Sequence, residues 1–193
     1  MSARIRIPLA ALLLLIPMSS ARAQVKTELT VAKLFSTAKP GHWIRLEGVP
    51  QADQAVLCTK AKILTGAIKE TAWTLKGQVR SVDPSKRQVA IGRHRVRLVE
   101  APKYSSPTNT LHGLSDLKPG MYVKVEGTYG KALGFLATKV DDQSAETAQK
   151  PGSERRVLHQ GRIERIDPAK KTIALMGTTF IVNDDTQVST VVK

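Results

Sequence analysis

The chain has 193 residues, enough for one ordinary domain or two small ones. It carries 30 Lys and Arg against 16 Asp and Glu, and this surplus favours polyanionic partners through the summed surface potential without defining a fold. Its one cysteine excludes a disulfide within the chain.

Residues 1–23 have the anatomy of a signal peptide. Arg4 and Arg6 form a short positive start, residues 9–18 are apolar, and an A-x-A pattern predicts cleavage after Ala23. The apolar run is about half of the ~20 residues that a membrane-spanning helix needs. We therefore predict a periplasmic or secreted protein whose mature form has no transmembrane segment and a net charge of +11, because the removed segment carries three of the 30 basic residues. The alternative is an N-terminal anchor that is not cleaved.

Two features precede the first clear strand pairs. Residues 29–35 favour a short helix that ends before Pro40. Cys58 lies in the apolar stretch 55–58, which predicts a buried thiol. The alternatives are a reactive thiol or a disulfide between two chains.

A first internal repeat relates residues 39–48 (KPGHWIRLEG) to residues 118–127 (KPGMYVKVEG), with five of ten positions identical. Each copy predicts a Pro-Gly turn, a strand, and a second turn at its last glycine, and a weaker similarity continues into the next strand. We call this element the back half of a module.

A second internal repeat relates residues 77–91 to residues 161–175, and we call it the front half. Each copy predicts a β-hairpin, because Asp-Pro opens a turn between two apolar runs, as at residues 83–86. Residues 93–98 follow as a third strand with clean alternation of basic and apolar side chains.

The order along the chain is back, front, back, front. Residues 73–142 therefore form a complete central module, whereas residues 30–66 and 158–193 are separate halves that are marginal alone. We predict an all-β protein of two small OB-like Greek-key barrels, the second assembled from the two ends of the mature chain, with residues 143–157 as a linker. The alternative is that each half extends the central barrel or pairs with another molecule.

The central module resembles a bacterial family called domain of unknown function 5666. The resemblance rests on Gly77 to Asp83, Leu117 to Gly127 and Leu136 to Val140, which match the glycine-led hairpin, the second glycine-bounded strand and the closing strand of that family. The resemblance implies an exported OB-like domain and indicates no particular activity.

The clearest candidate ligand site is a row of arginines. Arg93, Arg95 and Arg97 alternate with apolar positions, so their side chains share one face of the predicted strand. Three guanidinium groups in a row could bind phosphates or carboxylates, and strands two and three form the usual ligand face of OB folds. The alternative is an ordinary solvated face with acidic neighbours across the strands.

Trp43 and Tyr122 occupy equivalent positions in the two back halves. They could stack on bases or sugars, or they could pack between the two modules. The chain has only two Trp, three Tyr and three Phe, which favours packing because single-strand binders use several exposed aromatic rings.

Signatures of catalysis are missing from the sequence: it has no G-x-S-x-G, P-loop, H-E-x-x-H or dinucleotide-binding motif. The four histidines are scattered and lack partners at metal-ligand spacing. They are His42, His94, His112 and His159. We expect the acidic pairs 141–142 and 184–185 to serve turns or to face solvent. The sequence thus predicts no catalytic residue, no metal and no cofactor.

These observations favour a non-enzymatic periplasmic binding module that engages an anionic envelope polymer or an acidic protein through the basic strand face. One alternative is a structural or assembly protein that binds other envelope proteins. Another is an OB protein that binds oligonucleotides. A haem or metal chaperone is a third, although the His or Tyr ligand that it needs is not visible.

Overall fold

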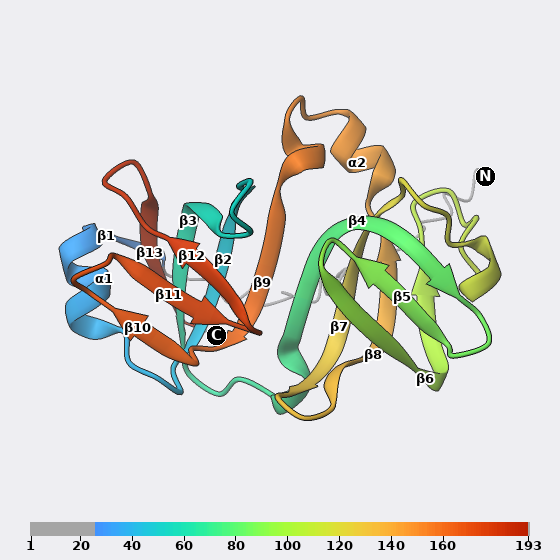
Figure 1. Ribbon diagram of the computed structural model, residues 1–193, viewed down its shortest axis with the longest axis horizontal. Helices are drawn as coiled ribbons and strands as arrows, with labels where there is room; N and C mark the ends of the chain where they lie inside the picture. Colours follow the sequence, from blue (N-terminus) through green and yellow to red (C-terminus); the bar gives the residue numbers. More distant parts are fainter. Residues whose placement is uncertain (1–25, 193) are drawn as a thin grey trace, which may run out of the picture.

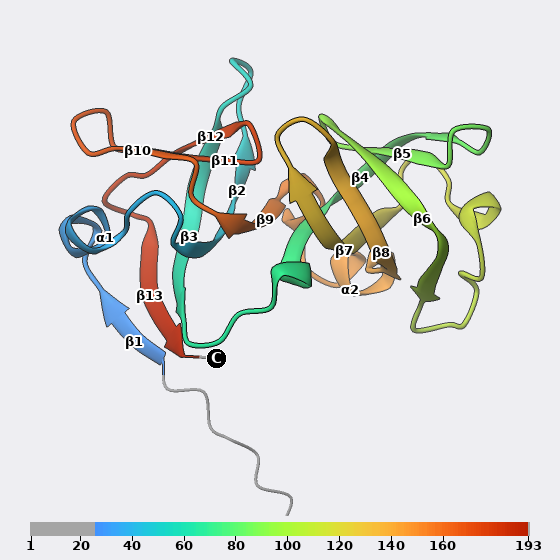
Figure 2. The same cartoon turned by 90° about the horizontal axis from the view of Figure 1, so that it is seen from below.

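A computed structural model describes residues 26–192, and this part of the chain is mostly β. Thirteen strands are joined by hydrogen bonds into one continuous sheet. The predicted signal peptide lies outside the described residues. Figures 1 and 2 show two halves side by side, a central one built from the middle of the chain and a terminal one built from both ends.

The central half is a five-stranded mixed β-barrel. Its strands are β4 (Trp73–Asp83), β5 (Gln88–Ile91), β6 (His94–Ser105), β7 (Tyr122–Gly130) and β8 (Gly134–Asp142). They pair in the order β4-β5-β6-β8-β7, and β7 pairs with β4 to close the ring. Only β6 and β8 run parallel. The apolar positions of the alternating strands fill its interior, with Val79, Val89, Val96, Val125 and Phe135 all at most 3% exposed.

The terminal half combines both ends of the described chain. From the N-terminal side come β1 (Lys26–Leu29), α1 (Val31–Thr37), β2 (Trp43–Pro50) and β3 (Val56–Thr65). From the C-terminal side come β9 (Val157–Arg162), β10 (Arg165–Asp167), β11 (Thr172–Leu175), β12 (Thr178–Ile181) and β13 (Gln187–Val192). Strand β2 pairs with β9, and β3 runs parallel to β12 and β13. Figure 2 shows β1 beside β13, so the two ends of the described chain meet.

The halves are joined by an antiparallel ribbon of β4 and β9, which lie side by side in the middle of Figure 1. Leu75 pairs with His159, and these two residues are equivalent in the front-half repeat. The pairing of Thr74 with Gln160 mirrors that of Lys76 with Leu158. The ribbon therefore has a local two-fold axis through its central pair, and the buried apolar residues of both halves form one cluster.

The turns predicted at the last glycine of each back half are wrong, because β2 and β7 both continue through these glycines. A β-bulge begins at Gly48 in β2 and at Gly127 in β7. A Cβ atom would lie 2.2 Å from the Leu57 carbonyl oxygen at the first position and 2.0 Å from that of Leu136 at the second. Only glycine lets the partner strand approach this closely, which accounts for its presence in both copies.

The helical segments differ in detail from the expectation. Helix α1 begins two residues later than predicted, because the Thr30 side chain accepts a hydrogen bond from the backbone of Lys33 at 3.2 Å and caps it. Short 3-10 helices cover Glu70–Ala72 and Leu114–Asp116. The predicted linker contains a helix, α2 (Ser144–Ala148), and a 3-10 turn at Ser153–Arg155.

One sequence-based prediction for the acidic pairs was wrong. Asp141 is 6% exposed rather than solvent-facing, because it lies on β8 beneath two lysines. Its carboxylate accepts a hydrogen bond from Ser105 and lies 3.0 Å from Lys139 Nζ and 3.6 Å from Lys124 Nζ. Asp142 accepts from the Ser144 backbone at 2.9 Å and serves the turn into α2, as predicted.

Candidate functional site

The outer surface of β5 and β6 carries exposed basic side chains. Arg95 and Arg97 are exposed on β6, and their antiparallel partners on β5 are Ala90 and Gln88. These neighbours are neutral, so the acidic cross-strand partners of an ordinary solvated face are not found beside either arginine on β5. Arg95 makes no hydrogen bond or ion pair within the described part of the chain, whereas Arg97 donates to the Leu133 carbonyl oxygen at 3.1 Å.

The turn between β4 and β5 adds Lys86 and Arg87 to this surface. Arg87 is held toward β6, because its guanidinium donates to the carbonyl oxygen of Val99. Lys86 lies 3.2 Å from Asp83, whose pKa is lowered by hydrogen bonds from the Ser85 hydroxyl and the Lys86 backbone. We call Lys86, Arg87, Arg95 and Arg97 the basic face.

A shallow hollow of about 240 Å³ lies on the basic face. It is lined by Ser81, Asp83, Lys86, Gln88, Ala90 and Arg95. Three strands contribute to it, so its position depends on the register of the barrel and not on one strand alone. Its lining carries charges of both signs, because Asp83 lines the hollow together with Lys86 and Arg95.

Arg93, the third arginine of the predicted row, makes a contact with the terminal half that the other two do not make. It is in the turn before β6, and its Nη1 atom donates to the Gln54 carbonyl oxygen at 2.7 Å. Gln54 belongs to the loop between β2 and β3, so this hydrogen bond connects the two halves of the molecule. The row is thus divided between the basic face and the junction.

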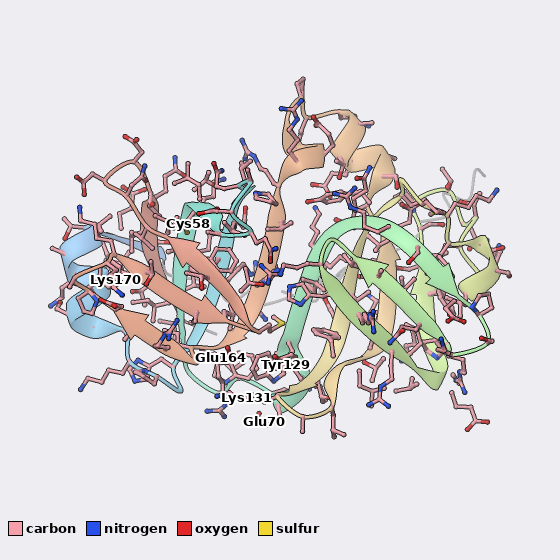
Figure 3. The ribbon with its side chains drawn as sticks, viewed as in Figure 1. Cys58, Glu70, Tyr129, Lys131, Glu164 and Lys170 are labelled. Carbon is pink, nitrogen blue, oxygen red and sulfur yellow. The ribbon has the colours of Figure 1, made fainter. Side chains whose placement is uncertain are left out.

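Lys131, in the turn between β7 and β8, does not extend the basic face. In Figure 3 it projects toward the terminal half, on the side of Glu164 and Glu70. Its neighbour Tyr129 packs against Trp73 at the same junction, with ring centroids 5.2 Å apart.

Trp43 and Tyr122 are both buried beside the junction. Trp43 is 7% exposed and packs against Trp73, with ring centroids 5.3 Å apart. Tyr122 is 5% exposed, donates its hydroxyl to the carbonyl oxygen of Arg156, and has the Lys76 ammonium 5.3 Å from its ring centroid. Neither ring is free to stack on a base or a sugar.

The structure brings together two of the histidines that looked scattered in the sequence. His94 of β6 and His159 of β9 have ring centroids 4.7 Å apart, and His94 Nε2 lies 3.1 Å from the Thr178 hydroxyl. Burial lowers the pKa of His94 to about 4 and lowers that of His159 well below its usual value. The one feature of the sequence that could have indicated this pair is that His159 stands where the other copy of the repeat has the apolar Leu75.

Cys58 is buried, as predicted. Its side chain is 1% exposed, and its Sγ atom lies 3.3 Å from the Lys60 carbonyl oxygen (Figure 3 marks its place in the terminal half). Burial raises the pKa of the thiol to about 12, so the nucleophilic thiolate is disfavoured at neutral pH.

Two other kinds of feature are absent from the part of the chain that the structure describes. Residues 26–192 contain no group of three or more His, Cys, Asp or Glu side chains that could hold a metal ion. Within the same range, no helix has the length and apolar character needed to cross a membrane.

The fold and the repeats define a mostly β protein of paired half-modules. The family model of the Domain of unknown function (DUF5666) matches residues 76–141 and again residues 160–191, together half of the sequence, so the chain belongs to this family. The two matches cover the central barrel and the C-terminal front half. No curated protein and no solved structure matches the chain.

Proposed function

We propose that this protein is a non-enzymatic binding module of the bacterial envelope, and that its basic face engages an anionic polymer. The observation that carries the proposal is the pairing of Arg95 and Arg97 with neutral residues on β5, which leaves their charge uncompensated on that side. Arg87 extends the same charge along the surface, whereas Lys86 is paired with Asp83. Phosphate or carboxylate groups repeated along a polymer would bind several of these side chains at once.

The position of the basic face supports the proposal if the central barrel is of the OB type. Its strand order, with a parallel pair between the third and fifth strands, is compatible with that assignment. Ligands of OB folds usually bind over the second and third strands and the loop between the first and second. Here these elements are β5, β6 and the turn that carries Lys86 and Arg87.

We further propose that the terminal half is a second OB-like barrel, with β9 and β10 acting as one interrupted first strand. Its pairing order β9-β2-β3-β12-β11-β10 repeats that of the central barrel. This second barrel has Thr179 and Ile181 where the first has Arg95 and Arg97, so anion binding is assigned to the central barrel alone.

Export to the periplasm is part of the proposal, and it rests on the signal-peptide pattern of residues 1–23. In that compartment the abundant polyanions are polymers and lipid head groups of the envelope. The oligonucleotide alternative has less support, because each of the eight aromatic Trp, Tyr and Phe side chains is at least partly buried.

Binding of the protein without its first 23 residues to immobilised dextran sulfate, with neutral dextran as the reference, tests the proposal. Affinity should fall at least tenfold between about 50 and about 200 mM salt, because bound counterions are released on binding. The Arg95→Ser/Arg97→Ser variant should bind at least tenfold more weakly than the wild type.

The matched control is Arg165→Ser/Lys170→Ser, which removes the same charge from exposed positions of the terminal half. It should change affinity less than twofold. Equal losses in the two double variants would reject a specific basic face. Quenching of tryptophan fluorescence by a short single-stranded oligonucleotide would instead support the oligonucleotide alternative.

A further inference from the structure

A cleft of about 260 Å³ lies between the two halves, on one side of the β4–β9 ribbon. Its lining comes from β4, β5, the turn before β6, the first residue of β6, the adjoining ends of β2 and β3 with their loop, β9 and β12. Leu75 and His159, the central pair of the ribbon, are both part of the lining. The cleft is therefore a product of the way in which the halves meet.

The walls of the cleft are largely apolar. Leu75, Ile91 and Val157 line it, and Gly77 leaves room because a Cβ atom there would lie 3.2 Å from the Ile91 side chain and 3.7 Å from that of Val157. Pro50 and Val56 contribute from the terminal half. Such a surface fits the hydrocarbon part of a small ligand.

Three basic residues and no acidic residue line the cleft, but the Lys76 ammonium lies outside it, near Gln143 and the Tyr122 ring. Lys76 Nζ lies 3.3 Å from Gln143 Oε1, Arg93 donates to a backbone carbonyl oxygen, and Arg80 has no hydrogen bond or ion pair within residues 26–192. Burial lowers the pKa of Lys76. Arg80 and Arg93 are both exposed, so their guanidinium groups are accessible to an anion that enters the cleft.

The two histidines supply the polar part of the lining. His159 is 2% exposed, and its Nδ1 atom has no hydrogen-bond partner. Native proteins rarely leave a buried polar atom unsatisfied, so this atom requires a partner, which a bound ligand or a water molecule can supply. His94 engages Thr178 across the junction, so both halves present a polar atom here.

We propose that this cleft binds a small carboxylate with a compact apolar body. The carboxylate interacts with Arg80 and Arg93, and the apolar body lies against Leu75 and Val157. A cleft of about 260 Å³ suits a small aryl or short acyl carboxylate of roughly ten non-hydrogen atoms. A ligand of this size should bind with a Kd on the order of 0.1 to 1 mM.

This site is separate from the basic face. Arg93 lines the cleft and Arg95 lines the hollow on the outer surface of β5 and β6, and these two hollows share no lining residue. Removing charge at one site should therefore weaken binding at that site and leave binding at the other unchanged. Experiments can thus distinguish the two sites.

The test is titration of the folded protein with 4-ethylbenzoate and, separately, with its neutral twin 4-ethylbenzamide, followed by backbone and histidine-ring NMR signals. The carboxylate should shift the signals of His94, His159 and Gly77. The Arg80→Gln/Arg93→Gln variant should bind the carboxylate at least tenfold more weakly. Its NMR signals away from the cleft should match those of the wild type, which shows that the variant is folded.

Arg95→Gln/Arg97→Gln is the matched control. Its affinity for 4-ethylbenzoate should stay within twofold of that of the wild type, even though its affinity for dextran sulfate falls. Three outcomes would overturn the cleft proposal: no saturable shift of the cleft signals by the carboxylate, equal loss of binding in both double variants, or equal affinity for the amide. None of these outcomes affects the binding of dextran sulfate, so the proposed function and the cleft proposal fail separately.

Discussion

The central and terminal halves contain the same repeated elements, but they differ in how continuous their strands are. Strand β4 runs unbroken for 11 residues and β6 for 12. The matching segments of the terminal half are each divided, into β9 and β10 and into β12 and β13. The pairing of β13 with β3 nevertheless keeps the register of β6 with β8, since Gln187 lies opposite Lys60 as Lys103 lies opposite Lys139.

The second interruption has a local cause. Residues 183–186 read Asn-Asp-Asp-Thr, where the central half has Val-Glu-Ala-Pro at residues 99–102. Asn and Asp favour turns over strands, because their side chains hydrogen-bond to nearby backbone groups. Here the Asn183 backbone donates to the Thr186 hydroxyl at 3.1 Å, and that hydroxyl donates to the Cys58 carbonyl oxygen at 2.8 Å. Equivalent elements thus tolerate different continuity as long as the pairing register is kept.

The largest expected effect tests whether the terminal half depends on its bulge as strongly as the central barrel does. Gly48→Val and Gly127→Val each place a side chain against a backbone carbonyl oxygen that is 2.2 Å or closer to the new Cβ atom. Each should lower the free energy of unfolding by more than about 4 kcal/mol. Urea denaturation followed by circular dichroism measures this.

Both variants should unfold in one transition, because the two halves share one buried apolar cluster. A biphasic curve for Gly48→Val, with a stable central barrel remaining, would show that the halves are independent.

The next effect concerns acid stability of the junction. The pKa of His94 is about 4 in the folded state and about 6.5 in the unfolded chain, so only the unfolded state takes up the proton between these values. Stability should therefore fall as the pH drops from about 6.5 to about 4, by about 3 kcal/mol for this residue. His159, whose pKa is also lowered, adds a loss of the same sign.

Chemical denaturation at a series of pH values measures this slope. The His94→Gln/His159→Leu variant should remove most of it. A wild-type stability that stays constant over this range would contradict the neutral, buried histidine pair. The Asp83 and Asp141 carboxylates do not interfere, because their lowered pKa values place their effect below about pH 4.

Exchanging the residue types of Leu75 and His159, the central pair of the β4–β9 ribbon, should change the free energy of unfolding in opposite directions. Leu75→His adds a polar ring to a fully buried position and should cost about 2 kcal/mol. His159→Leu removes the unpartnered Nδ1 atom and should stabilise the fold by about 1 kcal/mol at neutral pH. Thermal unfolding compares the two, and destabilisation by His159→Leu would mean that the imidazole makes a contact the fold requires.

The smallest effect is at Cys58, whose counterpart in the central barrel is Ala137, since both pair with the bulge glycine of the adjacent strand. Cys58→Ala should cost about 1 kcal/mol. In the native wild type the thiol should resist a thiol-specific alkylating reagent and become reactive on unfolding. Rapid modification of the folded protein, or a covalent dimer under non-reducing conditions, would favour the reactive-thiol alternatives.

The sequence by itself determined the strand content, the two repeats and their order, because alternation and turn residues act over short distances. It also identified Cys58 as buried and the arginines at positions 95 and 97 as exposed. The glycines at positions 48 and 127 stand out as the shared ends of the first repeat, where the pattern predicts turns and the strands form bulges.

Only the tertiary structure decided how the halves meet, since pairing of β4 with β9 joins segments more than 80 residues apart and leaves no local signal. That pairing brought His94 to His159, placed Arg93 against the Gln54 carbonyl oxygen, and created the cleft between the halves. It also buried the rings of Trp43 and Tyr122 at the junction, whereas Asp141 is buried among side chains of neighbouring strands within the central barrel. Long-range contacts of this kind depend on register and packing, which the periodicity of a single segment does not encode.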